Sequence, residues 1–226
     1  MTRWREYFVT LIVAVFLALL VRSYLVTAYR VPTGSMQPTL KPGDFIFSSR
    51  VSYGFRFPFV SQEFSTTLPE RGDLVVFTYP NQPDISYVKR VVALPGDRVQ
   101  ITDGRLLLNE TEVSYEKLSD GNSRDNPNSE IFDIFQEKMD EHQHRVIFQK
   151  IAEKKSFGPL VVPPGEVFLL GDNRDASDDS RYWGTVPMDQ VVGKVFLIWL
   201  SLDWQNKWGG DRYPSVRWNR VFSSVD

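Results

Sequence analysis

Hydrophobic residues follow two patterns along this chain, one continuous and one broken into short runs. Residues 7–21 read YFVTLIVAVFLALLV and contain no charged side chain. Beyond Ala28, apolar, β-branched and aromatic residues come in short runs separated by proline and glycine, which is typical of strands and turns. The pattern therefore predicts an N-terminal helix (1–28) followed by a mainly β domain (29–226).

The uncharged run is too short by itself to cross a membrane. Fifteen helical residues rise only about 22 Å, against a hydrocarbon core of roughly 30 Å. Adding residues 22–26 completes a span, with Arg22 at one interface, where its guanidinium can reach the headgroups. A cleavable secretion signal is the alternative, because Arg3 and Arg5 precede the run and Val-Thr-Ala follows at 26–28. A buried core helix fits less well, because the run has almost no polar face.

The short runs predict an antiparallel β fold with few helices. Turn residues lie between them, and Asp103-Gly104 between two apolar runs is the strongest hairpin signal. The expected strands are residues 44–48, 74–79, 87–94, 98–101, 105–108, 145–149, 167–170 and 191–199.

Two regions depart from this texture. Residues 114–155 are charged and polar, so we expect a peripheral insertion in the β domain, with solvated histidines at His142 and His144. The stretch from Trp199 interleaves tryptophan with arginine, which suits either a membrane interface or a cap over the β core.

Composition excludes several functions. A net charge of -2 argues against a nucleic-acid partner, because such proteins usually carry a basic patch. The absence of cysteine excludes a disulfide, a thiolate zinc site and a thiol nucleophile. A metal site is not expected at the two histidines, because no third ligand accompanies them.

Candidate chemistry begins with Ser35 and Lys89. Ser35 lies in PTGSMQPTL (32–40), which lacks the second glycine of a G-x-S-x-G turn, so a hydroxyl nucleophile here needs another base. Lysine can be that base when burial lowers its pKa. In a strand Lys89 and Arg90 point to opposite faces, so one can lie inward while the other stays solvated. A lysine on a wet edge strand is the alternative interpretation.

A third polar segment, GDNRDASDDSRYWG (171–184), follows an apolar run. It lacks the glycine and the glutamate that a calcium loop places at its sixth and twelfth positions. Its serines, aspartates and arginines predict either a buried polar network or a solvated turn rich in Asp and Asn.

Taken in order, PTGSMQPTL (32–40), RGDLVVF (71–77), YVKRVVALPGD (87–97) and GDNRDASDDSRYWG (171–184) resemble the conserved segments of bacterial type I signal peptidases. The resemblance implies a membrane-anchored serine protease of antiparallel β fold, without a cofactor. Such an enzyme cleaves signal peptides from precursor proteins, in contact with membrane lipid and without nucleic acid.

The resemblance also implies roles for individual residues. Ser35 would be the nucleophile, Lys89 the general base, and Thr33, where serine is more usual, an oxyanion donor beside Ser35. Ser177 would orient the lysine, supported by an Asp179–Arg181 ion pair; Ala176 departs from the usual asparagine at a position without assigned chemistry. The residues expected to line the pockets for small substrate side chains are Val31, Pro32, Met36, Leu40, Tyr87 and Val88.

The implied location is the bacterial cytoplasmic membrane, with one retained span, a cytoplasmic N-terminus and the β domain on the outer face. A specialised Ser-Lys peptidase that matures pilins or conjugation proteins remains an alternative. A membrane-tethered β scaffold without catalysis is the non-enzymatic alternative. The distance from Ser35 to Lys89 distinguishes the enzymatic readings from the scaffold.

Overall fold

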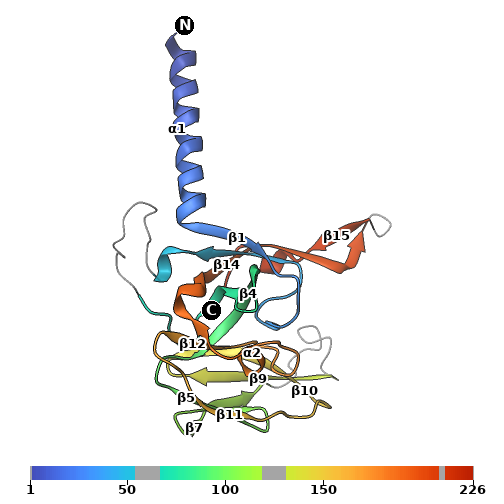
Figure 1. Ribbon diagram of the computed structural model, residues 1–226. Helices are drawn as coiled ribbons and strands as arrows, with labels where there is room; N and C mark the ends of the chain where they lie inside the picture. Colours follow the sequence, from blue (N-terminus) through green and yellow to red (C-terminus); the bar gives the residue numbers. More distant parts are fainter. Residues whose placement is uncertain (1, 54–66, 119–130, 209–211, 226) are drawn as a thin grey trace.

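The structure, a computed structural model, describes residues 2–53, 67–118, 131–208 and 212–225. In Figure 1 one long helix, α1 (Thr2–Tyr24), projects from a body built of strands. The expectation of a mainly antiparallel β fold is confirmed. Among the described residues, no helix has both the length and the hydropathy required to cross a membrane.

The largest sheet contains nine of the described strands, in the order β1-β2-β14-β3-β4-β12-β13, with β15 and β16 also paired to β14. The long strand β14 joins the N-terminal strands to the C-terminal ones. The strands of this sheet are β1 (Val26–Arg30), β2 (Asp44–Ser49), β3 (Leu74–Tyr79), β4 (Gln82–Ala93), β12 (Glu166–Leu170), β13 (Val186–Pro187), β14 (Val191–Trp208), β15 (Tyr213–Val216) and β16 (Ser223–Ser224).

Two smaller sheets and a few helical turns complete the described fold. One sheet is β10 (His142–Gln149), β9 (Phe132–Met139) and β8 (Ser114–Lys117), and the other is β11 (Phe157–Val161), β5 (Arg98–Thr102), β6 (Arg105–Leu108) and β7 (Thr111–Glu112). The short helical elements are α2 (Ser180–Trp183), η1 (Val51–Tyr53), η2 (Met188–Gln190) and η3 (Trp218–Arg220).

All eight expected strands are present, several with longer bounds. The predicted hairpin joins β5 to β6, with Thr102 opposite Arg105. Its two turn residues, Asp103 and Gly104, have φ angles of 49° and 79°. Positive φ at both central positions is what a two-residue hairpin turn of type I′ requires, which explains the Asp-Gly pair.

The expectation for the polar segment at 114–155 is wrong in one respect. His144 on β10 is only 3% exposed and Glu137 on β9 is fully buried, so the segment is not simply a solvated periphery. The two side chains are cross-strand neighbours, and a ring nitrogen of His144 lies 3.0 Å from a Glu137 oxygen. Pairing removes much of the cost of burying these polar groups. His142, by contrast, is exposed as predicted.

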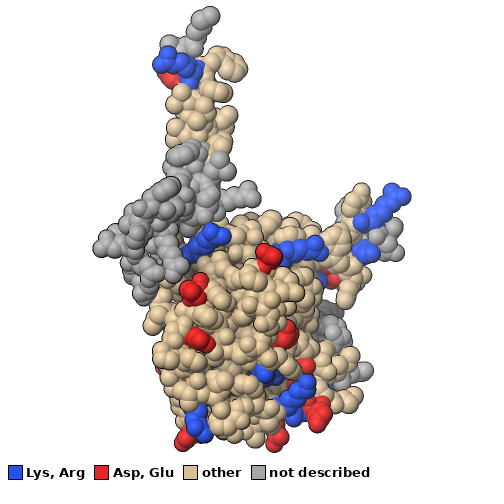
Figure 2. Space-filling view, viewed as in Figure 1, with Lys and Arg blue, Asp and Glu red and all other residues tan. Residues whose placement is uncertain are grey.

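The exposed part of α1 is apolar. Tyr7, Phe8, Leu11 and Ile12 are each more than half exposed. Figure 2 shows charged side chains at the far end of α1.

Candidate active site

Ser35 lies in the turn that connects β1 to β2. The turn is closed by backbone hydrogen bonds from Gln37 N to Gly34 O (3.1 Å) and from Leu40 N to Met36 O (2.8 Å). Met36 and Leu40 are 2% and 0% exposed and pack into a core cluster with residues of β2, β3 and β14. These two apolar anchors hold the turn against the large sheet, and Ser35 stays half-buried at its surface.

Lys89 reaches Ser35 from β4. It pairs with Val75 of β3 and is 3% exposed, and its Nζ lies 2.7 Å from Ser35 Oγ. Burial lowers the pKa of Lys89 to about 8, although the carboxylates of Asp179 and Asp178 oppose the shift. The neutral amine is therefore a minor form at pH 7, about one molecule in ten, and about half of the molecules carry it at pH 8.

The expectation that Arg90 stays solvated beside an inward Lys89 is wrong, because Arg90 is 2% exposed. Its guanidinium donates to both carboxylate oxygens of Asp172, at 2.8 and 2.7 Å, and to the carbonyl of Gly72 at 2.6 Å. Burial raises the pKa of Asp172, but Arg90 outweighs it and holds the pKa below its ordinary value. Both faces of β4 are therefore covered, one by the site and one by this ion pair.

Of the two alternatives for the segment 171–181, the structure shows the buried polar network and not the solvated turn. The segment also holds the Ser35 turn in place. Asn173 donates from its backbone N–H to the carbonyl of Ser35 and from its side chain to that of Gly34, each at 3.1 Å. A Cβ on Gly171 would lie 2.6 Å from the Ser35 carbonyl and 2.1 Å from Ser177 Oγ, so this position has no room for a side chain. Asn173 and Gly171 were not singled out from the sequence.

Asp179 and Arg181 form the expected ion pair, with Arg181 Nε 2.7 Å from Asp179 Oδ1. Asp179 is fully buried, and it also accepts from the backbone N–H of Gly171 at 3.1 Å. Arg181 donates to the carbonyl of Arg174 at 2.6 Å. The pair thus ties the two ends of the segment together.

Ser177 is buried, and both its side chain and the Ser35 carbonyl lie next to Gly171. Its hydroxyl has no hydrogen-bond partner within the described parts of the chain. The structure therefore does not join Ser177 to Lys89 by a hydrogen bond, and its orienting role stays a prediction.

A cavity of about 450 Å³ opens beside Ser35 and Lys89. Five of the six predicted pocket residues line it, namely Val31, Pro32, Met36, Tyr87 and Val88. Leu40 is not among its lining residues and lies fully buried in the core. Ile85 and Ala176, which were not predicted, also line the cavity. Its walls are mainly apolar and suit small hydrophobic side chains.

The sheet of β8, β9 and β10, called the inserted sheet below because its strands come from the polar segment at 114–155, supports this site directly. Ile147 of β10 donates to the carbonyl of Asp172 at 2.9 Å and accepts from the N–H of Arg174 at 3.1 Å. Arg174 is buried and donates to both oxygens of Glu137, each at 2.6 Å. The sequence does not reveal this support, because Ile147 and Glu137 are on β10 and β9, whereas Asp172 and Arg174 are in the distant loop after β12.

Thr33 lies beside the nucleophile at the mouth of the cavity. Its Oγ1 is 3.4 Å from Ser35 Oγ, and either hydroxyl can be the donor. Thr33 is exposed, so its hydroxyl can turn toward a bound substrate. Its role as an oxyanion donor stays a prediction.

We expect Thr33→Val to lower turnover about a hundredfold or more while substrate affinity changes little, because an oxyanion donor acts mainly in the transition state. Thr33→Ser, which keeps the hydroxyl, is the matched control and should retain most activity. Steady-state kinetics on a precursor peptide measure both parameters. Equal turnover by Thr33→Val and the wild type would assign the oxyanion to backbone N–H groups instead.

The arrangement is able to carry out nucleophilic hydrolysis. A serine hydroxyl touches a buried amine with a lowered pKa, and an apolar cavity lies alongside. Lysine in this state can accept the hydroxyl proton, which histidine does in other serine hydrolases. No cluster of three or more potential metal ligands is found in the described residues.

Comparison with known proteins identifies the family. The family described as "Signal peptidase, peptidase S26" matches residues 4–200. The chain is 40% identical to signal peptidase I of Pseudomonas fluorescens over 87% of its own length and 72% of that protein. It is 31% identical to signal peptidase I of Rickettsia typhi over 98% of its length and 94% of that protein. The chain belongs to the peptidase S26 family of signal peptidases.

Among solved structures, a signal peptidase I from Enterococcus faecalis is 30% identical. The match covers 57% of this chain and 98% of that one, with a TM-score of 0.36.

Proposed function

We propose that the protein is a membrane-bound serine endopeptidase that removes N-terminal signal peptides from exported precursor proteins, with Ser35 as nucleophile and Lys89 as general base. The observation that carries the proposal is the 2.7 Å contact between Ser35 Oγ and the buried Nζ of Lys89, in a chain of the signal peptidase family. A non-catalytic scaffold has no need to bury an amine against a hydroxyl, because an unpaired buried lysine is costly.

In the first half of the reaction, neutral Lys89 accepts the Ser35 proton as Ser35 Oγ attacks the scissile carbonyl. The resulting oxyanion is stabilised by the Thr33 hydroxyl and the Ser35 N–H. Collapse breaks the C–N bond, and the Lys89 ammonium gives its proton to the departing amine. This step leaves the signal peptide as an ester on Ser35.

In the second half, Lys89 takes a proton from water, which attacks the ester carbonyl. The second tetrahedral intermediate releases the signal peptide, and Ser35 Oγ recovers its proton from Lys89. Ser177, Asp179 and Arg181 would hold the lysine and its surroundings in place rather than touch the substrate. The buried Asp179–Arg181 pair supports this assignment.

The substrate class follows from the cavity. Walls formed by Val31, Met36 and Val88 suit small apolar side chains, as in an Ala-x-Ala cleavage sequence. Leu40, placed in the core, would act on these pockets indirectly, because it belongs to the same buried cluster as Val31 and Met36.

We further propose that α1 is a single-pass anchor in the bacterial cytoplasmic membrane, with the N-terminus in the cytoplasm and the β domain on the outer face. The uncharged run at 7–21 and the exposed apolar side chains of α1 support an environment of lipid. An anchor of this kind would place the site where precursors leave the membrane.

Cleavage of a purified precursor tests the proposal. The full chain in detergent should cut after an Ala-x-Ala sequence, as measured by mass spectrometry of the products. A matched precursor with phenylalanine in place of the last alanine should be cleaved more slowly, because walls formed by Val31, Met36 and Val88 suit small apolar side chains. Absence of turnover on the alanine precursor by folded protein would favour the scaffold.

We expect the turnover number to rise with pH through a pKa of about 8, because only the neutral form of Lys89 accepts a proton. Below this pH the amine is charged and activity should fall about tenfold per pH unit. A pH profile of single-turnover rates measures this limb. A limb near the ordinary histidine pKa, removed by His142→Gln, would contradict a lysine base.

The electrostatic influence on the pKa of Lys89 can be tested at Asp178, which is exposed and whose charge raises that pKa. Asp178→Asn removes that charge, so the rising limb should move to lower pH by a few tenths of a unit. His142→Gln is the control, because His142 lies on the inserted sheet and does not line the cavity.

A further inference from the structure

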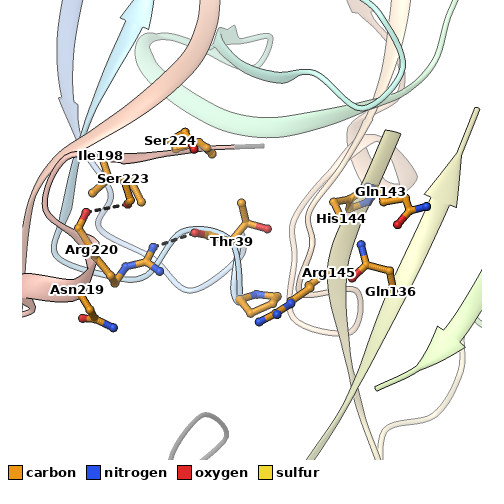
Figure 3. Close-up of a pocket in the computed structure, with 12 residues that line it drawn as sticks. Thr39, Gln136, Gln143, His144, Arg145, Ile198, Asn219, Arg220, Ser223 and Ser224 are labelled. Carbon is orange, nitrogen blue, oxygen red and sulfur yellow. Dashed lines mark hydrogen bonds between the residues drawn. The ribbon is translucent and has the colours of Figure 1, made fainter. Parts of the chain in front are cut away.

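A second cavity, of about 410 Å³, lies between the inserted sheet and the C-terminal segment. It shares no lining residue with the cavity beside Ser35. Figure 3 shows Gln136, His144 and Arg145 of β9 and β10 on one side, and Asn219, Arg220 and Ser223 on the other. Three segments far apart in the sequence therefore build it, the third being the turn that contains Thr39.

The lining of this cavity is polar and cationic. Arg145 and Arg220 reach it from opposite sides, and none of its described lining residues is Asp or Glu. Arg145 is exposed and makes no ion pair within the described part of the chain. Amide side chains of Gln136, Gln143 and Asn219 add further donors. Nothing in the proposed peptidase reaction uses these groups.

Buried carboxylates stand behind the cationic groups and do not enter the cavity. Asp44 is fully buried and accepts from Arg220, which also donates to the Thr39 carbonyl at 2.8 Å. Glu137 is fully buried and lies against the ring of His144. These buried carboxylates orient Arg220 and His144 and leave the other polar atoms of both side chains available to a ligand.

His144 supplies a buried polar atom that lacks a partner. Its Nε2 lies 3.0 Å from a Glu137 oxygen, and neither ring nitrogen has an aligned hydrogen-bond partner in the described residues. Burial and the nearby Arg90 keep the pKa of His144 below its ordinary value, which favours the neutral ring. If the ring proton is on Nε2, toward Glu137, then Nδ1 is an acceptor to which a P–O–H group can donate. On protonation it would donate to a phosphate oxygen.

We propose that this cavity binds the phosphate group of a small organic phosphate. Two arginines on opposite sides suit a tetrahedral oxyanion better than a planar carboxylate, because its oxygens point in several directions. The volume falls in the range of small-molecule sites and exceeds what a phosphate alone would fill, so an organic part can follow. The bound ligand would join the C-terminal segment to the inserted sheet.

Calorimetric titration of the full chain in detergent, in a phosphate-free buffer, tests the site with glycerol 3-phosphate as the probe. We expect saturable binding that weakens about tenfold or more in Arg145→Gln, which removes a cation, and in Asn219→Asp, which adds a carboxylate of the same shape. Arg98→Gln is the matched control, because Arg98 is an exposed arginine on β5, outside the cavity. Equal weakening in all three variants, or in none, would overturn the site.

A second readout uses the only two histidines of the chain. The probe should shift the NMR signals of the His144 ring and leave those of His142 unchanged. Shifts of both rings alike, or of neither, count against the site. This measurement does not depend on peptidase activity, so it stands apart from the test of the proposed function.

The same titration distinguishes two sources of phosphate. If the protein binds glycerol 3-phosphate but not a soluble short-chain phosphatidylglycerol, the natural ligand is a free phosphate metabolite. Binding of the short-chain lipid, weakened in Arg145→Gln, assigns a lipid headgroup. Binding of neither overturns the proposal.

Discussion

Replacing Ser35 with alanine is expected to reduce precursor cleavage by roughly 10⁴-fold or more, and replacing Lys89 with alanine should do the same. Nucleophile and base work as a unit, so loss of either removes the covalent route. The 2.7 Å contact between them is the physical basis of this expectation. Single-turnover cleavage of an Ala-x-Ala precursor measures both variants.

Two further substitutions at Lys89 distinguish the need for a positive charge from the need for a group that accepts a proton. Lys89→Arg should be inactive, because a guanidinium stays protonated and cannot accept the serine proton. Lys89→Met keeps the length without the amine and should fold at least as well as the wild type, because it removes a costly buried amine. Lys138→Ala, which changes an exposed lysine of β9, is the control for loss of a positive charge. Substantial turnover by folded Lys89→Met would exclude the lysine base.

The second large effect concerns stability. We expect Asp172→Ala to lower the free energy of unfolding by about 3–5 kcal/mol, because it leaves the buried Arg90 guanidinium without its counter-charge. The same change removes the acceptor of the Thr39 hydroxyl. Urea unfolding of the full chain in detergent, followed by tryptophan fluorescence, measures the loss.

A double variant tests whether this loss of stability comes from the unpaired charge of Arg90 or from the space left by the deleted carboxylate. Asp172→Ala combined with Arg90→Met removes both charges, and it should be more stable than Asp172→Ala alone. Asp175→Ala is a matched control, because Asp175 lies in the same segment but pairs with the partly exposed Lys154. A double variant that is less stable than Asp172→Ala would show that the buried charge is not the source of the loss.

The sequence predicted the strands well, because their patterning is local. The eight runs and the Asp103-Gly104 turn each carry their signal within a few residues. The contact of Ser35 with Lys89 could be expected only from the resemblance to signal peptidases. From the residues alone, a lysine in a β-forming run is more often a solvated residue of an edge strand.

The buried polar groups escaped prediction for a common physical reason. Arg90 can be buried because both carboxylate oxygens of Asp172 accept hydrogen bonds from it, and that partner lies 82 positions away. Glu137 and His144 read as surface residues of a polar segment, yet Arg174 on another segment makes their burial tolerable. A hydrophobic pattern cannot reveal a charge that a distant partner neutralises.

The backbone pairing of Ile147 with the segment at 172–174 bears on the design of a minimal enzyme. Deletion of the whole segment 114–155 would remove the strand that pairs with residues 172–174. It would also leave Arg174 buried without the Glu137 carboxylate. Any shortened version must therefore keep β9 and β10, or graft in another hairpin that offers a glutamate and two free backbone groups at the same places. The segment that looks most dispensable by composition is thus a required part of the smallest workable scaffold.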